Sequence, residues 1–362
     1  MSKKKKLFTL FLALTVVFTM CFAAVPAYAA SGTAITNADE LKAMSANGNY
    51  YLANDIEVPA NLILFTSYDA PFTGTLDGNG HAIKGYTYTA SADWTEQAAL
   101  FGYAKNATFK NLKMTEVNIS LNQAGTAAAL VAASENCKFT DIRVSGKIVG
   151  KSLSTAAGIV AYSYEGGTLT NCKNSADITI TNADEGSEAA GVAGFIGSAG
   201  SMKNCSNSGK ISISGSIEAA SISAAGVVLS VGKTTSCKNS GTISVSAIGN
   251  GSMNDECIAA GVAVEVDTAV SCSNTGKVSM NATVEAVDPH RGGGVFGSVT
   301  KSASKCYNKG AVSYSGKSSR GICVGGVSGT ARRISQSYNK GSVTVKIPSA
   351  KSAEQNEVGG VC

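Results

Sequence analysis

The sequence of 362 residues has five prolines, one tryptophan and two histidines, and only 15% of its residues are charged. The histidines, His81 and His290, are far apart in the chain, and the ten cysteines form no Cys-x-x-Cys pair. These absences argue against a zinc site, and we predict neither a metal nor a cofactor. After Val25 no apolar run is long enough to span a bilayer.

The first 29 residues have the features of a Sec signal peptide, with an uncleaved membrane anchor as the alternative. Four lysines, Lys3–Lys6, precede an apolar run from Leu7 to Val25, and Ala27-Tyr28-Ala29 follows as a small-residue cleavage site. Removal of the four lysines lowers the formal charge from +5 to +1. A net charge this close to zero gives no support for nucleic-acid binding. The signal peptide leads us to expect an extracellular or cell-surface protein.

What the sequence has in abundance is glycine, with 40 residues, together with serine, alanine and threonine. This composition favours short strands and tight turns over helices. The exception is Asn37-Ala-Asp-Glu40, which has the pattern of a helix start and predicts a short helix through about Ser45. We assign residues 30–64 to an N-terminal cap.

A repeat with a period of 31 to 35 residues organises the chain from about residue 125 onward. One copy is Gly191–Ser214, with a Gly-Val strand, a polar bend, Cys-x-Asn-x-Gly and a final strand of alternating Ile and Ser. Such periods mean stacked repeats. We predict an all-β protein, a right-handed parallel β-helix over residues 65–362 with a short N-terminal capping helix. A β-propeller is the alternative, although its blades usually carry their own Trp or His signatures.

The segments PFTGTLDGNGHAIKGY (71–86) and ALFGYAKNATFKNLKM (99–114) resemble the opening of bacterial GLUG-type surface proteins. Later copies such as GGVFGSVTKSASKCYNKGAVSYSG (293–316) are similar to the repeats that accompany that motif. The resemblance implies a secreted or wall-attached β-helix, often of adhesin type, and implies no catalytic residues. Since the sequence stops where another coil should begin, we expect it to be truncated at its C-terminus.

Three columns of repeated residues are expected to be structural. The cysteine column is expected to be a buried stack of free thiols, with scattered disulfides as the alternative. An asparagine at each bend is expected to bond along the stack, and the glycine two residues later to adopt positive φ. The cysteines are Cys137, Cys172, Cys205, Cys237, Cys272 and Cys306, with Ser337 in the last copy; the asparagines are Asn174, Asn207, Asn239, Asn274, Asn308 and Asn339; the glycines are Gly209, Gly241, Gly276, Gly310 and Gly341.

Two polar groups resemble catalytic pairs but are better explained otherwise. Asp77 is the first residue of Asp-Gly-Asn-Gly and His81 follows it, so this group is better explained as turn chemistry. Asp288, His290 and Arg291 form a second polar group in a loop. A polysaccharide lyase or glycoside hydrolase would need carboxylates converging on one face of neighbouring coils. We predict no catalytic residues.

Charged and hydroxyl side chains recur at the edges of the predicted coils. Loops after the last strand of each copy collect acids, and their variable length marks them as candidate binding loops; these candidates are Asp184, Glu185, Glu188, Asp255, Glu256, Glu285 and Asp288. The bend collects lysines instead, namely Lys173, Lys210, Lys238, Lys277, Lys309 and Lys340. An outward row of hydroxyls, Thr179, Ser212, Ser244, Ser279, Ser313 and Thr344, is ordinary for a solvated sheet but could also bind ice or a glycan.

These patterns predict a non-enzymatic binding protein with a host-surface, matrix or glycan ligand. The alternative is a polysaccharide lyase or glycoside hydrolase on the same scaffold, because fold alone does not determine activity.

Overall fold

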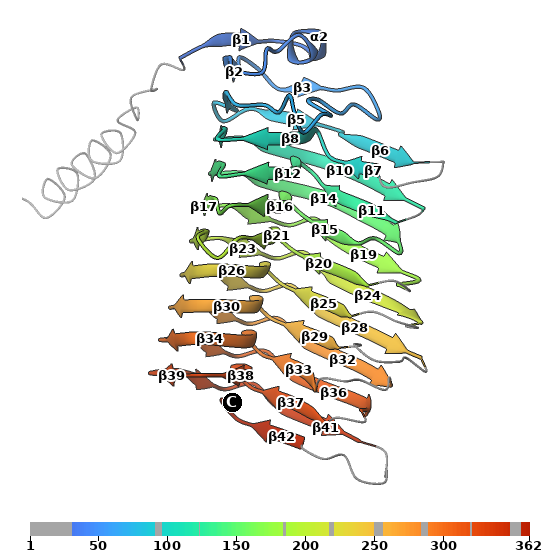
Figure 1. Ribbon diagram of the computed structural model, residues 1–362, viewed down its shortest axis with the longest axis vertical. Coiled ribbons are helices and arrows are strands. Elements are labelled where there is room, and N and C mark those ends of the chain that lie inside the picture. The colour runs from blue at the N-terminus through green and yellow to red at the C-terminus, as the bar shows by residue number, and fades with distance from the viewer. Residues whose placement is uncertain are drawn as a thin grey trace, which may run out of the picture. The chain divides into compact units, whose positions relative to one another are not determined.

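The computed structural model describes residues 31–90, 96–122, 124–183, 186–216, 221–249, 256–283, 289–318, 321–347 and 356–362. Residues Gly32–Cys362 form one compact unit in which successive coils stack in chain order, from blue to red in Figure 1. Each regular coil contributes strands to three sheets, which we call sheets A, B and C. Neighbouring coils pair in parallel in all three. The prediction of an all-β parallel β-helix is confirmed.

Sheet C is the simplest of the three, with nine strands in the described residues. Its strands are β7 (Glu96–Ala98), β11 (Gly125–Ala128), β15 (Thr155–Ala157), β20 (Ser187–Ala190), β25 (Ile222–Ala225), β29 (Cys257–Ala260), β33 (His290–Gly293), β37 (Ile322–Gly325) and β42 (Asn356–Gly359).

Sheet A follows sheet C in each regular coil, often as two short strands, and begins earlier in the chain, at β1. Its strands are β1 (Thr33–Ile35), β2 (Asn49–Leu52), β4 (Thr75–Asp77), β8 (Phe101–Lys105), β9 (Thr108–Lys110), β12 (Val131–Glu135), β13 (Lys138–Thr140), β16 (Val160–Tyr164), β17 (Thr168–Thr170), β21 (Ala193–Ile196), β22 (Ser201–Lys203), β26 (Val228–Thr235), β30 (Ala263–Val270), β34 (Phe296–Ser304), β38 (Ser328–Ala331) and β39 (Ile334–Ser335).

Sheet B completes the coil. Its strands are β3 (Ile56–Glu57), β5 (Ala82–Lys84), β6 (Thr87–Ala90), β10 (Lys113–Leu121), β14 (Arg143–Lys151), β18 (Lys173–Asn174), β19 (Asp177–Thr181), β23 (Ser206–Asn207), β24 (Ile211–Ser216), β27 (Lys238–Asn239), β28 (Ile243–Ile248), β31 (Ser273–Asn274), β32 (Val278–Thr283), β35 (Tyr307–Asn308), β36 (Val312–Lys317), β40 (Tyr338–Asn339) and β41 (Val343–Lys346).

The N-terminal helix α2 (Ala38–Lys42) lies beside the first coil (Figure 1). The Asn37 side chain accepts hydrogen bonds from the backbone N–H groups of Asp39 and Glu40, as a helix N-cap does. The Glu40 carboxylate in turn accepts from the Thr36 backbone N–H (2.6 Å) and hydroxyl (2.9 Å). Leu41 is fully buried under the helix. The predicted start is confirmed, and the helix ends three residues earlier than expected.

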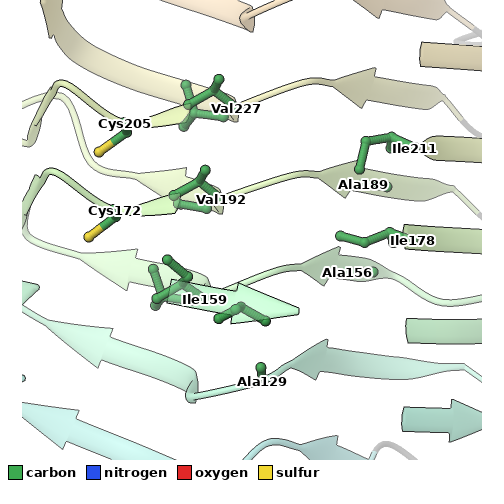
Figure 2. Packing of buried hydrophobic residues seen from close by; sticks show 14 of the residues in the cluster. Ala129, Ala156, Ile159, Cys172, Ile178, Ala189, Val192, Cys205, Ile211 and Val227 are labelled. Carbon is green, nitrogen blue, oxygen red and sulfur yellow. The ribbon is translucent and has the colours of Figure 1, made fainter. Parts of the chain in front are cut away.

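The core consists of columns of equivalent side chains, one from each coil. In Figure 2, Ile178 and Ile211 lie one above the other, as do Val192 and Val227, and all four are fully buried. The alternation of buried and outward residues along the sheet B strands follows from the two-residue period of a strand. One coil alone could not bury these side chains, so the stack itself creates the core.

The cysteine column is buried and its thiols are free in the described residues. Cys172 and Cys205 point the same way from adjacent coils (Figure 2), and the thiol of Cys205 contacts those of Cys172 and Cys237. Burial raises the pKa of the Cys205 thiol well above its usual range.

The placement of Cys137 in this column is wrong. Arg143 pairs with Lys173, so the residue that stacks on Cys172 is Ile142. Cys137 lies at the turn before β13, where its sulfur accepts a hydrogen bond from the Ala107 backbone N–H (3.4 Å). The early coils are shorter than the later ones, and extrapolating the later period backward misaligned them.

The asparagine column forms a continuous ladder from Asn174 to Asn339. Each side-chain amide donates to the carboxamide oxygen of the next coil at 2.8–2.9 Å. The same amide nitrogen donates to the backbone carbonyl two residues ahead, as Asn239 does to Gly241 (2.8 Å). The ladder therefore satisfies polar groups that the bend buries.

The predicted positive φ at the glycines that follow the ladder is wrong. None of these glycines is among the positive-φ residues of the described chain; that conformation falls on the residue before each column cysteine, such as Asn171 (φ 57°) and Asn204 (φ 54°). The glycines are needed for close packing instead. A Cβ on Gly241 would lie 2.0 Å from the Gly209 carbonyl oxygen of the preceding coil.

Candidate functional site

The outward side of sheet B carries cations from coil after coil. We call this surface, from β14 to β41, the basic face. It includes all six lysines that the sequence placed at the bends, and each of them is exposed. Its cations are Arg143, Lys147, Lys151, Lys173, Lys210, Lys238, Lys277, Lys309, Lys317, Lys340 and Lys346.

The strand register explains why these cations share a face. Arg143 pairs with Lys173, and Lys173 precedes Ser206 and Lys238 in the same column. In the strand register Lys147 lies opposite Asp177. Asp177 is the one acidic residue at these outward positions. Because alternate residues of a strand point to one side, lysines at every second position all face outward.

These cations have no carboxylate partner in the part of the chain that the structure describes. The ion pairs found there engage other lysines, such as Lys105 with Glu135 and Lys301 with Asp267. The Asp177 carboxylate instead accepts a hydrogen bond from the Lys210 backbone N–H (2.7 Å). The positive charge of the face is therefore largely uncompensated by its own side chains.

A groove runs across several coils where sheet A turns into sheet B. Its volume is about 690 Å³. It is lined by Asp141, Arg143, Asn171, Lys173, Asn204, Cys205, Ser206, Ser236, Lys238, Ser271, Ser273 and Tyr307. Cations, amides and hydroxyls thus dominate its polar lining.

The groove follows a column of left-handed residues. Five residues of this column have φ between 54° and 57°, namely Asp141, Asn171, Asn204, Ser236 and Ser271. This conformation turns the chain sharply between the two sheets, and Asn and Asp adopt it most readily after glycine. The Asn204 amide donates to the Asn171 carboxamide oxygen (3.2 Å), which forms a second, exposed asparagine contact on the groove wall.

Two rows of hydroxyls continue the face beyond the groove. The first row is the one predicted from the sequence, and each of its residues lies opposite the next in the strand register. Its members are Thr179, Ser212, Ser244, Ser279, Ser313 and Thr344. A second row, two residues farther along the strands, contains Thr181, Ser214 and Ser246. The face therefore offers hydrogen-bonding groups between its charges.

Two tyrosines near the C-terminal end of the face were missed by the sequence reasoning. The rings of Tyr307 and Tyr338 stack at 5.3 Å, with 7° between their planes. Lys309 lies over Tyr307 (5.4 Å), and Lys340 over Tyr338 (5.5 Å). The last two copies have the sequences Cys-Tyr-Asn and Ser-Tyr-Asn, with a tyrosine where earlier copies have Lys or Ser. This substitution was the feature of the sequence that could have predicted the aromatic pair.

Most of the predicted acidic binding residues lie outside the described part of the chain, namely Asp184, Glu185, Asp255, Glu285 and Asp288. The other two candidates, Glu188 and Glu256, belong to the sheet C side of the coil and not to the basic face.

Glu188 is largely buried in β20, where it contacts the Thr155 hydroxyl. Burial raises the pKa of its carboxyl to about 7, and the hydrogen bond from Thr155 opposes that shift. The Thr155 hydroxyl also bonds to the Tyr162 hydroxyl (2.5 Å). Glu188 is thus tied into a polar cluster at the junction of sheets C and A.

Glu256 forms a two-point ion pair with Arg291, in which Nε and Nη2 of the guanidinium each donate to one carboxylate oxygen. The Glu256 side chain is only 12% exposed. Both groups of this pair are therefore committed to each other.

The two polar groups that resembled catalytic pairs have structural partners. The Asp77 carboxylate accepts from the Asn79 backbone N–H (2.8 Å) and pairs with Lys110 (3.1 Å), while His81 lies 3.4 Å from Asp55. His290 is fully buried and its Nδ1 accepts from the Cys257 backbone N–H (3.1 Å). Turn and core chemistry account for these contacts.

Within the described ranges, no group of three or more His, Cys, Asp or Glu side chains is arranged to hold a metal ion. The described residues also include no helix with the length and apolar character needed to cross a membrane.

No known protein-family model matches the chain, and neither does any curated protein compared with it. One solved structure, titled a "putative immunoglobulin A1 protease" from Bacteroides ovatus, is similar over 85% of each chain, with 17% identity and a TM-score of 0.48. The likeness is distant. It says nothing about activity here.

Proposed function

We propose that this protein is an extracellular or cell-surface binding protein whose basic face holds an acidic polysaccharide. The observation that carries the proposal is the concentration of exposed cations on sheet B, with no carboxylate partners among the described residues. A surface of one charge sign attracts and concentrates polymers of the opposite sign.

The geometry of the face suits an extended polymer. Successive coils repeat at about 4.8 Å, which is close to the length of one sugar residue in an extended chain. Arg143 and Lys173 occupy adjacent coils, and Lys238 follows two coils later in the same column. A chain laid along the groove would meet a cation at several of its residues.

The polar groups between the cations favour a sugar over another polyanion. Asn171 and Asn204 line the groove, and the rows of hydroxyls extend beside it. Amides and hydroxyls both donate and accept hydrogen bonds, as sugar hydroxyls do. The predicted export of the chain, its resemblance to GLUG-type surface proteins and an adhesin-like role fit the same proposal.

The experiment compares polysaccharides that differ in charge. We expect the purified protein to bind sulfated and uronate-rich polysaccharides, and to bind neutral dextran far more weakly. Replacing Lys173 and Lys238 with glutamine removes two groove contacts of roughly 0.5–1 kcal/mol each. Affinity should fall roughly five- to thirtyfold.

A matched control removes the same charge elsewhere. Lys138 and Lys233 are exposed on sheet A, so their replacement by glutamine lowers the net charge equally but leaves the basic face intact. Equal losses in both double variants would contradict a specific face. Competition by duplex DNA as strong as by the polysaccharide would contradict the assignment to a sugar. Release of reducing ends or unsaturated products during incubation would favour the alternative, a lyase or hydrolase.

A further inference from the structure

A second, smaller cavity opens on sheet A near the N-terminal coils. Its volume is about 250 Å³. Its main groups are Tyr68, Tyr103, Lys105, Glu135 and Tyr164. They come from β8, β12 and β16, which stack one above the other (Figure 1), and from the loop that contains Tyr68.

We propose that this cavity binds a single neutral sugar ring, in a site separate from the basic face. The cavity is smaller than the roughly 300–1,000 Å³ that drug-sized ligands occupy, so its capacity suits one ring and not an extended chain. The proposal rests on the aromatic rim, on the paired charges inside it and on the rigid loop that closes one side.

The aromatic rim is exposed yet held in place. Tyr68 is 63% exposed and Tyr164 is 54% exposed, and both side chains line the cavity. The Tyr68 ring meets the Tyr103 ring edge-on at 5.8 Å. The Tyr164 ring stacks on Tyr162 at 6.0 Å, and Tyr162 stacks on Phe195 at 5.5 Å. Exposed tyrosine faces are available to the C–H face of a sugar ring.

The charges inside the cavity match sugar hydroxyls. Lys105 pairs with Glu135 at 2.6 Å, and the Glu135 side chain is only 14% exposed. The pair presents an ammonium donor beside a carboxylate acceptor. Two neighbouring hydroxyls of a sugar can accept from the first and donate to the second.

The same pair argues against other ligand classes. An aromatic rim with a carboxylate would suit a quaternary ammonium ion. Here the Lys105 ammonium already occupies the position beside Glu135 and opposes a second cation. An apolar ligand would have to desolvate the ion pair without replacing its hydrogen bonds, which is costly.

The loop that carries Tyr68 is fixed at both ends by the core. Phe65 and Phe72 contact each other at 5.2 Å, and each also packs on Phe101, at 5.9 and 5.3 Å. The backbone bonds to β8 on both sides, from Tyr103 N–H to the Phe65 carbonyl (2.9 Å) and from Phe72 N–H to the Tyr103 carbonyl (3.0 Å). The binding groups are thus held in position before a ligand arrives, which reduces the entropy cost of binding.

The test uses the purified protein and a panel of methyl glycosides of glucose, galactose, mannose and N-acetylglucosamine. Saturation-transfer NMR should detect at least one of them in contact with tyrosine protons. Titration calorimetry should then show binding that is roughly three- to tenfold weaker in Tyr68→Ala and in Tyr164→Ala, because each loses one aromatic contact. Both residues are exposed, so these variants should keep the melting temperature of the wild type.

Two further variants separate this site from the proposed polysaccharide face. Glu135→Gln should weaken glycoside binding, while Lys173→Gln should leave it unchanged, because Lys173 lies in the groove of the other face. Absence of saturation transfer from every glycoside would overturn the proposal. So would equal binding by the wild type and the Tyr68 and Tyr164 variants, or displacement of the glycoside by tetramethylammonium.

Discussion

Replacing Asn207 with alanine would interrupt the asparagine ladder near its middle. The buried Asn207 side chain makes three hydrogen bonds. It donates to the Asn239 carboxamide oxygen (2.9 Å) and to the Gly209 carbonyl (2.8 Å), and it accepts from the Asn174 amide (2.8 Å). The nearest outward residue of the next strand, Ser212, provides a matched control in the same coil.

The expected cost follows from these contacts. Each hydrogen bond contributes about 1 kcal/mol net, and buried acceptors left unpaired cost about 1–3 kcal/mol more. Since such terms are not additive, we expect Asn207→Ala to lower the free energy of unfolding by roughly 3–5 kcal/mol. Ser212→Ala should change it by no more than about 0.5 kcal/mol.

Hydrogen exchange is the appropriate assay because a stack of coils can open locally before it unfolds globally. Amide protection in β23, β24 and the paired strands β27 and β28 should fall in Asn207→Ala and stay unchanged in Ser212→Ala. Equal protection in the two variants would refute the claim that the ladder stabilises the stack.

Two other substitutions test particular features of the fold. Burial raises the pKa of Glu188 above its unfolded value, so its protonated form favours the folded state below about pH 4.5 and this contribution is lost as the pH rises through about 7. Glu188→Gln should therefore have a free energy of unfolding up to about 3 kcal/mol higher than the wild type between about pH 5 and 8. Parallel curves of melting temperature against pH for the wild type and the variant would contradict the burial. Gly241→Ala should lower the free energy of unfolding in urea by about 3 kcal/mol or more, because its Cβ would meet the Gly209 carbonyl oxygen at 2.0 Å. Gly80→Ala has no such neighbour and should lose only about 1–2 kcal/mol, through its positive φ of 84°; equal losses would argue against the packing explanation.

The repeat was sufficient to predict the parallel coils, the asparagine ladder and the buried thiols. Equivalent residues in every copy can only be brought together by stacking, so Asn174 to Asn339 had to form a column. Errors arose where the coil length changes. The early coils are shorter, and Cys137 therefore falls at a different corner from Cys172.

The candidate site was only partly visible in the sequence. The lysines at the bends were predicted from the sequence. That they share one face could be seen only from the strand register, because Lys173, Lys210 and Lys309 occupy three different columns. The burial of Glu188 depends on neighbours from β15 and β16, which are distant in the sequence. The cavity under Tyr68 could not be predicted either, because a loop from one coil closes over strands of three others.

The affinity of the protein for a sulfated polysaccharide at two salt concentrations tests the proposed role of the basic face most directly. Binding should be tight at about 50 mM salt and much weaker at about 300 mM, as added ions screen the exposed charges. The Lys173→Gln, Lys238→Gln double variant should bind more weakly than wild type at low salt and lose less affinity as salt is added. Identical affinity and salt dependence for the wild type and this variant would contradict the account.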